Sequence, residues 1–310
     1  PPPPFFFPAE DGIRDSSTSR GLGDVYKRQT LWVRLWACNL QCHGFGQKDP
    51  TDPSTYKLPY ADLDPSKYNR LEDFPVFEFG CDSSYSWSRK FKDKQHKGTP
   101  KEIYDRLIEC MMKGGPNHHG LVKDNHMCFT GGEPMLKHNQ EAIIDVMRQF
   151  MEHENLPPSI TIETNGTQDL NYDAGFVTMV DDYVENFGGE LFFSVSPKLH
   201  NVSGELNDKA IKPEVVENYY DLSKKGQLKF VVNETDDCWK ELDHVIRLYR
   251  ARGINYPIWI MPVGAKKESQ EDVAGEIATK ALKRGYRVAA RVHCYLWGCL
   301  LYTSDAADER

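Results

Sequence analysis

The feature that most constrains the fold is a regular alternation of short apolar runs with helix-length amphipathic segments, which begins at Thr30. Parallel strands need crossover connections of about a dozen residues or more, usually helices, so this alternation predicts βαβ units and a parallel sheet. Six or seven repeats favour a partial (β/α) barrel of about six parallel strands over a two-domain dinucleotide-binding fold. Chemistry in such barrels lies at the C-terminal ends of the strands.

The expected elements follow from hydrophobic spacing and from helix-end signals. Strands are predicted at 31–36, 126–130, 160–163, 191–195, 227–232, 257–261 and 286–292. Helices are predicted at 99–112, from the Gly-Gly after the second strand to Met151, and at 213–224, 238–252 and 270–284. The first helix has the clearest start, because Thr99 and Glu102 form a capping-box pattern around Pro100.

Composition and charge exclude some classes of protein. The 310 residues carry a formal net charge of -8, which argues against a broad nucleic-acid-binding surface. The sequence has no run of about 18 apolar residues that would span a membrane. Eight cysteines in a chain of this length are not a disulfide scaffold. We therefore expect a cytoplasmic protein in which clustered cysteines bind metal or take part in catalysis.

The two ends of the chain differ from the rest. Residues 1–29 begin with a proline and phenylalanine run and have no helical or strand period, and residues 299–310 follow the aromatic segment that ends at Gly298. Both resemble translated sequencing-adapter sequence, the alternative being disordered natural tails. We exclude them from the fold prediction and expect one domain over 30–298, with its native N-terminal segment missing.

A long irregular stretch interrupts the alternation at 43–80. It is rich in proline, aspartate and tyrosine and has no period. A loop of this length inside a compact domain is usually functional or disordered. We interpret it as an insertion between the first strand and the following helix, and its role is open.

The cysteines near this insertion are candidate metal ligands. Cys38 and Cys42 follow the first strand with a spacing suited to one metal centre, but Phe45 stands where a third ligand would usually come. Taken alone, the pair is weak evidence for a cluster, and two structural thiols are the favoured interpretation. The remaining cysteines fall within predicted helices or strands, where core packing is expected: Cys110, Cys128, Cys238 and Cys294.

Further segments of the sequence contain motifs that bear on the role of Cys38 and Cys42. The sequence resumes after the insertion with Cys-Asp-Ser-Ser-Tyr-Ser-Trp at 81–87, and the second strand leads into Thr-Gly-Gly-Glu-Pro at 130–134. TIETNGT at 161–167, VSPK at 195–198, LKFVV at 228–232, Met-Pro at 261–262 and Val-His with Leu-Trp-Gly at 292–298 follow in order. Together these motifs resemble the radical S-adenosylmethionine (SAM) superfamily and, more narrowly, the 7-carboxy-7-deazaguanine synthase family, over essentially 30–298.

The resemblance implies a 4Fe–4S cluster bound by Cys38, Cys42 and Cys81. The insertion then lies inside the cysteine motif. Three thiolates leave one iron open, and SAM would chelate that iron. In the family, the hydroxyl that Ser83 supplies here binds Mg²⁺ beside the substrate, a role that fits a hard oxygen ligand. The resemblance thus implies three cofactors: the cluster, SAM and Mg²⁺.

The resemblance also assigns the residues at the strand ends. Residues expected to contact SAM are Gly131, Gly132, Glu133, Glu163, Asn165, Ser196 and Lys198. Residues expected to contact the substrate are Arg34, Thr130 and His293. An arginine inside a barrel strand needs an anionic partner, which a substrate carboxylate or an internal ion pair would supply. A plain turn at Gly131-Gly132 and a solvated Lys198 are the simpler alternatives.

The implied reaction is the radical ring contraction of 6-carboxy-5,6,7,8-tetrahydropterin to 7-carboxy-7-deazaguanine with loss of ammonia, in 7-deazapurine synthesis. The implied partners are this pterin and an electron donor such as flavodoxin or ferredoxin. No membrane or nucleic-acid partner is expected, and a homodimer is left open.

The chain departs from the family in two places. The substrate-binding segment before the first strand is absent, and Arg291 and Cys294 replace the usual residues around the last histidine. The alternatives are another radical SAM enzyme, such as a glycyl-radical activase, and a non-enzymatic zinc-binding domain that uses the three cysteines and His43.

Overall fold

An open eight-stranded sheet forms the framework of the computed structural model, which describes residues 5–7, 13–15, 29–69, 73–113 and 126–290. Seven of its strands run parallel in the order β10-β9-β8-β7-β6-β5-β3, and β2 pairs antiparallel with β3 at the edge. The strands are β2 (Ile13–Asp15), β3 (Gln29–Leu35), β5 (His126–Gly131), β6 (Ser159–Thr164), β7 (Glu190–Val195), β8 (Gly226–Val232), β9 (Ile258–Pro262) and β10 (Arg287–Val288). The predicted partial (β/α) barrel is confirmed, with seven parallel strands rather than about six.

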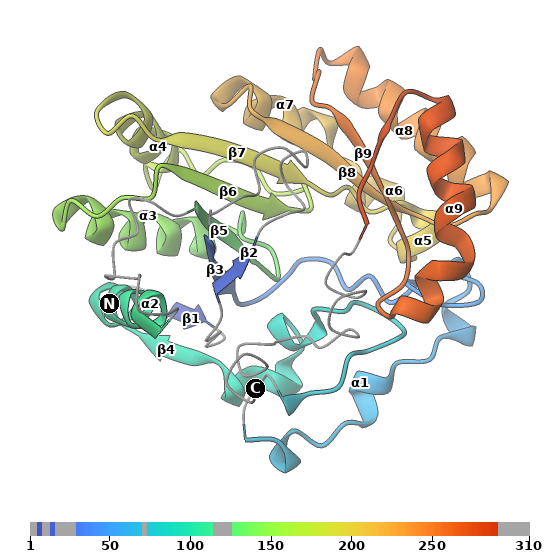
Figure 1. Cartoon of the computed structure of the whole chain (residues 1–310), viewed down its shortest axis with the longest axis horizontal. Helices are drawn as coiled ribbons and strands as arrows, with labels where there is room; N and C mark the ends of the chain where they lie inside the picture. Colours follow the sequence, from blue (N-terminus) through green and yellow to red (C-terminus); the bar gives the residue numbers. More distant parts are fainter. Residues whose placement is uncertain (1–4, 8–12, 16–28, 70–72, 114–125, 291–310) are drawn as a thin grey trace.

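Helices lie along the outer side of this curved sheet (Figure 1). They are α2 (Pro100–Lys113), α3 (Lys137–Glu152), α4 (Phe176–Glu185), α7 (Pro213–Leu222), α8 (Asp236–Ala251) and α9 (Lys267–Lys283), with the short α5 (His200–Ser203) and α6 (Asn207–Ala210) after β7. The predicted capping box at α2 is confirmed, because Glu102 Oε2 accepts the Thr99 N–H at 2.7 Å and Thr99 Oγ1 accepts the Glu102 N–H at 3.3 Å.

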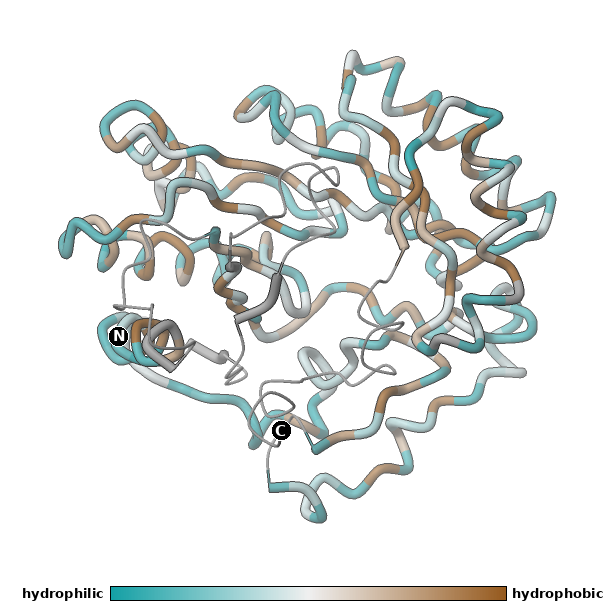
Figure 2. Tube along the Cα trace, viewed as in Figure 1, coloured by the Kyte–Doolittle hydropathy of each residue, from teal (hydrophilic) through white to brown (hydrophobic). Residues whose placement is uncertain are grey.

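The two faces of the sheet have different chemistry because successive strand residues point to opposite sides. On β3, Leu31, Val33 and Leu35 belong to the main hydrophobic core, which the strands share with the outer helices. Figure 2 shows apolar residues recurring along the strands and the helices that cover them. The opposite face carries a polar row, which begins at Arg34 and Thr130 and is described with the site.

The helix α4 is absent from the sequence prediction, although its pattern is clear afterwards. Phe176, Met179, Val180 and Tyr183 are buried and recur at helical spacing. The preceding Gly175 has a left-handed φ of 82° and no side-chain cap, so the usual start signal is missing. The last strand is also shorter than predicted over the described residues: β10 covers Arg287–Val288, and the predicted part beyond residue 290 lies outside them.

The N-terminal stretch contributes two short strands. Besides β2, β1 (Phe5–Phe7) pairs antiparallel with β4 (His96–Gly98). Backbone pairing of three residues needs no side-chain period, which is why the sequence pattern does not indicate it. The interpretation of 1–29 and 299–310 as adapter-derived sequence stays a prediction.

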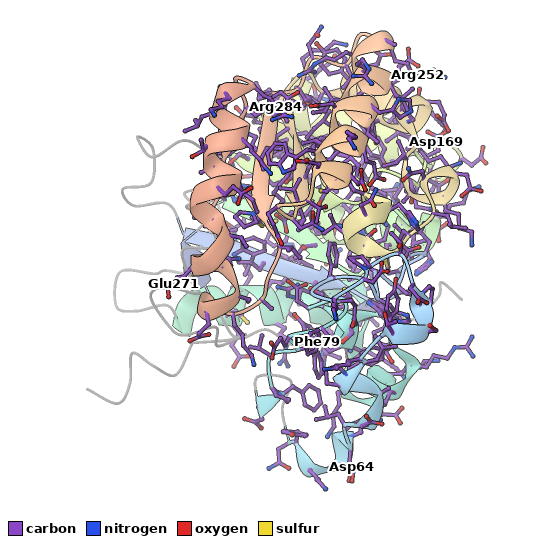
Figure 3. The ribbon with its side chains drawn as sticks, turned by 90° about the vertical axis from the view of Figure 1, so that its right-hand side faces the viewer. Asp64, Phe79, Asp169, Arg252, Glu271 and Arg284 are labelled. Carbon is purple, nitrogen blue, oxygen red and sulfur yellow. The ribbon has the colours of Figure 1, made fainter. Side chains whose placement is uncertain are left out.

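The two ends of the insertion 43–80 lie next to each other. The Gly80 N–H donates to the Phe45 carbonyl oxygen at 2.8 Å, and a Cβ on Gly46 would lie 2.5 Å from the Glu78 carbonyl oxygen. We call this closure between 45–46 and 78–80 the neck. Figure 3 shows Phe79 of the neck against the body of the protein and Asp64 at the far end of the insertion.

Beyond the neck, the insertion contains short turns and a small aromatic cluster. The turns are η1 (Pro53–Thr55), α1 (Pro59–Asp62) and η2 (Pro65–Lys67). Tyr60, Phe74 and Phe77 pack with Tyr85 and Phe91 from the segment that follows. That segment forms η4 (Ser84–Ser86) and η5 (Arg89–Lys94). The insertion therefore contacts the segment that follows Cys81, and the neck closes it before Cys81.

Candidate functional site

The first two cysteines lie on a strained loop after β3, which we call the cysteine loop (37–44). Ala37 and Cys42 have left-handed φ angles of 76° and 51°, which are uncommon for residues other than glycine. Cys38 Sγ accepts the Leu40 N–H at 3.5 Å. The loop thus turns back on itself directly beyond the C-terminal end of β3, where chemistry is expected in a (β/α) barrel.

The neck brings Cys81 to the same place. The Gly80 N–H donates to the carbonyl oxygen of Phe45, three residues after Cys42. The chain therefore returns from the insertion next to the cysteine loop. Cys38 and Cys81 pack with the small apolar cluster of Leu40, Cys42 and Ala210. The structure therefore collects the three predicted ligands, although 38 residues separate Cys42 from Cys81 in the sequence.

The three thiols share an environment that keeps them protonated in the absence of a metal. Burial, with the nearby Glu133 carboxylate, raises the pKa of Cys38 to about 12, and burial with Asp82 raises the pKa of Cys81 to about 11. Burial also raises the pKa of Cys42 well above its usual value. Lys198 acts in the opposite direction on all three. Metal binding here would release protons, since thiolates are the ligand form.

The donors grouped at the cysteine loop are three thiols, with His43 nearby in the sequence. Within the described ranges, no three His, Cys, Asp or Glu side chains converge so as to hold one metal ion. In an iron–sulfur cluster each cysteine binds a different iron, so three thiols surround the cluster instead of converging. His43, the fourth zinc ligand of the alternative hypothesis, has its Nε2 2.8 Å from the Tyr60 hydroxyl. The chemistry of three grouped thiols would fit a 4Fe–4S cluster with one open iron.

The remaining cysteines of the described chain are buried in the core, as predicted. Cys110, Cys128 and Cys238 are buried, with little exposure. Cys294 lies outside the described residues.

The Gly-Gly pair after β5 packs against the cysteine loop. Gly132 N–H donates to Leu35 O at 2.9 Å and Glu133 N–H donates to Ala37 O at 2.8 Å. A Cβ on Gly132 would lie 2.0 Å from Ala37 O, and one on Gly131, whose φ is 114°, would lie 2.4 Å from Leu35 O. Both glycines are therefore required by the protein's own backbone contacts, whereas the sequence suggested close approach to a ligand.

The buried Glu133 side chain connects strand ends through hydrogen bonds. Its Oε1 accepts from Met135 N at 2.9 Å and Thr164 Oγ1 at 2.6 Å, and its Oε2 accepts from Asn165 N at 2.7 Å. Burial raises the pKa of this carboxyl despite those hydrogen bonds. Both carboxylate oxygens of Glu133 already accept hydrogen bonds from the protein, so a SAM contact, as predicted, would have to share these oxygens. The same hydrogen bonds show that Glu133 positions the strand ends.

Asn165 and the Ser196–Lys198 segment reach the cysteine loop from the next strand ends. Asn165 Nδ2 lies 3.1 Å from Asn39 Oδ1 and 3.9 Å from Cys38 Sγ. Lys198 Nζ donates to Ser196 Oγ at 3.0 Å and lies over the Phe45 ring, 5.8 Å from its centroid. Lys198 thus faces the thiols from the β7 end instead of standing free in solvent.

A polar row crosses the inner face of the sheet. The cross-strand partners Arg34 and Thr130 lie at one end, and Glu163 pairs with Ser194, which pairs with Gln227. Thr130 Oγ1 donates to Glu163 Oε2 at 3.1 Å, and Lys229 Nζ forms an ion pair with Glu163 Oε1 at 3.1 Å. Arg34 lies over the Tyr85 ring at 5.8 Å. The row is a polar surface on the face of the sheet opposite the main hydrophobic core.

The charges in this row stabilise one another. Burial would raise the pKa of Glu163, but Lys229, Thr130 and Arg34 together bring it below its usual value. Lys229 and Glu163 are 17% and 28% exposed, so a ligand can reach the pair. The row can therefore bind a polar ligand with an ionised group.

Two predicted site residues remain. Ser83 Oγ donates to Asp82 Oδ1 at 3.2 Å, directly after Cys81, and Ala37 N–H donates to Ser86 O at 2.9 Å, which fastens this segment to the end of β3. Ser83 and Asp82 offer oxygen atoms directly after Cys81. His293 lies outside the described residues.

The sequence analysis missed two residues. Lys229 could have been found as a charged residue at an alternating position in the apolar strand QLKFVV. Glu205 accepts hydrogen bonds from the Gln41 and Cys42 backbone, and no local pattern indicates it because the contact spans more than 160 residues.

Comparison with known proteins gives one consistent name. The chain is 26% identical over 237 residues to a 7-carboxy-7-deazaguanine synthase of Pyrobaculum aerophilum, covering 76% of this chain and 86% of the relative. It is 24% identical over 298 residues to one of Rhodopirellula baltica (92% and 86%) and 27% identical over 190 residues to one of Halobacterium salinarum (56% and 65%). No family model matches the chain, and no solved structure matches it significantly. The chain is thus similar to three curated proteins that bear the same enzyme name.

Proposed function

We propose that this protein is a 7-carboxy-7-deazaguanine synthase, a radical SAM lyase that converts 6-carboxy-5,6,7,8-tetrahydropterin to 7-carboxy-7-deazaguanine with loss of ammonia. The observation that carries the proposal is the return of Cys81 to Cys38 and Cys42 through the neck. The names of the three relatives support the same reaction.

In this proposal Cys38, Cys42 and Cys81 hold a 4Fe–4S cluster with one open iron for SAM. The cluster and SAM, when bound, supply the radical that begins the ring contraction. The backbone at Gly131 and Gly132, with Glu163, Asn165, Ser196 and Lys198, lines the SAM side, and Glu133 fixes these strand ends relative to the cysteine loop. Lys198, which lies near all three thiols, favours their ionised form.

The polar row binds the substrate in this proposal. The Arg34 guanidinium clamps the substrate carboxylate, Thr130 supplies a hydrogen bond, and His293 completes the pocket from outside the described residues. Ser83 holds Mg²⁺ with substrate oxygens and water. Lys229 adds a second cation, so that an anionic substrate is favoured over a neutral one.

The partners follow from the chemistry. The pterin is a small molecule, and a one-electron donor such as flavodoxin or ferredoxin is needed to reduce the cluster. No helix in the described ranges is both long and apolar enough to cross a bilayer. We place the protein in the cytoplasm because free, grouped thiols persist in a reducing compartment.

The direct test is product formation by the anaerobically reconstituted protein with dithionite, SAM, Mg²⁺ and the tetrahydropterin. Chromatography with mass detection should show 7-carboxy-7-deazaguanine. If 5′-deoxyadenosine forms without the deazaguanine, the substrate assignment is wrong and another radical SAM reaction, such as glycyl-radical activation, takes its place. If neither forms and the isolated protein contains zinc, the enzyme assignment fails.

A further inference from the structure

The segment after Lys198 packs against the cysteine loop and hydrogen-bonds to it. Gly44 N–H donates to Ser203 O at 2.8 Å, and a Cβ on Gly44 would lie 2.6 Å from the Gly204 nitrogen. Glu205, two residues further on, accepts the Gln41 N–H at 2.7 Å and the Cys42 N–H at 2.6 Å, both on its Oε1 atom. One carboxylate oxygen therefore fixes two consecutive amides of the loop.

This contact meets a structural need of the loop. Cys42 has a left-handed φ of 51°, a conformation that a residue with a side chain adopts only when its surroundings impose it. Glu205 is itself held, because its N–H donates to Ser203 Oγ at 3.2 Å and its carbonyl oxygen lies 3.1 Å from His200 Nδ1. The carboxylate is thus a fixed acceptor placed where the loop would otherwise relax.

The same carboxylate places a negative charge beside a predicted cluster ligand. Glu205 lies close enough to Cys42 to interact with its thiol electrostatically. Negative charge near an iron–sulfur cluster favours the oxidised state, whereas N–H donors to its sulfurs favour the reduced state. Glu205 supplies negative charge, and it accepts hydrogen bonds from two N–H groups that would otherwise be available to donate to the cluster sulfurs.

We propose that Glu205 is a positioning residue, which holds the cysteine loop in its ligand-presenting conformation and lowers the reduction potential of the bound cluster. The inference rests on the proposed function, because it requires that the three cysteines bind a cluster.

The experiment compares three variants of the full chain after anaerobic reconstitution. Glu205→Gln keeps an oxygen acceptor but removes the charge, and Glu205→Ala removes both. Glu241→Gln is the matched control, since Glu241 likewise accepts two consecutive backbone N–H groups, those of His200 and Asn201, at 2.7 and 2.9 Å. Circular dichroism establishes folding, iron retention against a chelator measures anchoring, and a redox titration followed by electron paramagnetic resonance (EPR) measures the potential.

The inference predicts separate effects. Glu205→Gln retains iron, but its midpoint potential moves to less negative values. Glu205→Ala retains iron about 10- to 100-fold less well, as expected for loss of a residue that orients a ligand. Glu241→Gln matches the unaltered protein in both measurements.

The outcomes separate this inference from the proposed function. If Glu205→Gln leaves the potential unchanged, or if folded Glu205→Ala retains iron normally, the inference is overturned while the function stands. If Glu205→Ala does not fold, the potential of Glu205→Gln decides. If the unaltered protein binds no cluster, both the function and the inference are wrong.

Discussion

The ion pair between Lys229 and Glu163 is the residue-scale feature with the clearest consequence for ligand binding. Arg34 and Lys229 bring positive charges to the polar row, and both lower the pKa of the Glu163 carboxyl. A charge in a partly buried site is stable when an opposite charge or hydrogen bonds compensate its lost hydration. In the proposed function, the substrate carboxylate joins these charges.

Replacing Lys229 with Met should weaken both stability and substrate binding. Glu163 would keep its buried charge without its partner, and we expect a loss of about 1–3 kcal/mol in the free energy of unfolding, less than for a fully buried pair. The KM for the pterin should rise more than kcat falls, because a binding charge is lost. Denaturant titration and steady-state kinetics measure these effects.

Lys225→Met is the matched control for this variant. Lys225 pairs with Glu190 at 2.6 Å, but the two side chains are 61% and 31% exposed. A surface pair contributes about 0–1 kcal/mol, so this variant should resemble the unaltered protein. Equal effects of the two substitutions would show that the polar row does not bind an anion.

The pKa of Glu163 predicts a pH dependence. Despite burial, Lys229, Thr130 and Arg34 hold this pKa below its usual 4.5 in the folded protein. The ionised group therefore contributes stability that is complete above the unfolded pKa and is lost as the pH falls through the folded pKa. The difference in unfolding free energy between the unaltered protein and Glu163→Gln should be constant from about pH 8 to pH 5.5 and shrink below about pH 4.5. A difference that changes with pH near neutrality would contradict this origin.

At the scale of elements, the turn between β5 and α3 connects the sheet to the cysteine loop. Its backbone donates to Leu35 and Ala37, and Glu133 then joins the ends of β5 and β6. The site is consequently built from strand ends that are hydrogen-bonded to one another. A change in this turn should move the loop that carries Cys38.

Gly132→Ala should test this connection. The new Cβ would lie 2.0 Å from the Ala37 carbonyl oxygen, so the turn and the cysteine loop must separate. We expect a loss of about 1–3 kcal/mol in unfolding free energy, typical of overpacking, and poorer cluster incorporation. Gly275→Ala in α9 is the control: nothing lies within 4 Å of the position that its new methyl group would take, and helix propensity predicts a gain of up to about 1 kcal/mol. Similar stability for the two variants would refute the close approach.

The elements predicted from sequence and those missed differ in a physical way. The strands and helices that the sequence predicts between Leu31 and Lys283 follow from hydrophobic period and from caps such as Thr99, which are local signals. The helix α4 begins at an uncapped Gly175 and was missed. The grouping of Cys38, Cys42 and Cys81 could be predicted from motifs. The hydrogen bonds of Glu205 and Glu133 depend on contacts between distant segments, which no local pattern encodes.

At the scale of the whole molecule, the neck brings the two parts of the split cysteine motif together. Loop closure entropy grows only slowly with length, so an insertion of 38 residues costs little if its ends are fixed together. The Phe45–Gly80 hydrogen bond fixes them, and the aromatic cluster around Tyr60 and Phe77 fills the insertion. An ion pair between Glu78 and Lys266 at 3.0 Å also joins the neck to the loop before α9. The insertion is thus attached to the barrel beside the predicted cluster.

The account's central claim is that Cys81 is the third cluster ligand across this neck. The most direct measurement is EPR of the anaerobically reconstituted, dithionite-reduced protein, with and without SAM, beside Cys81→Ala and the core-thiol control Cys238→Ala. We predict a 4Fe–4S signal that SAM perturbs, that Cys238→Ala keeps and that Cys81→Ala loses. A protein that forms no cluster, or a Cys81→Ala variant with an unchanged SAM-responsive signal, would contradict the claim.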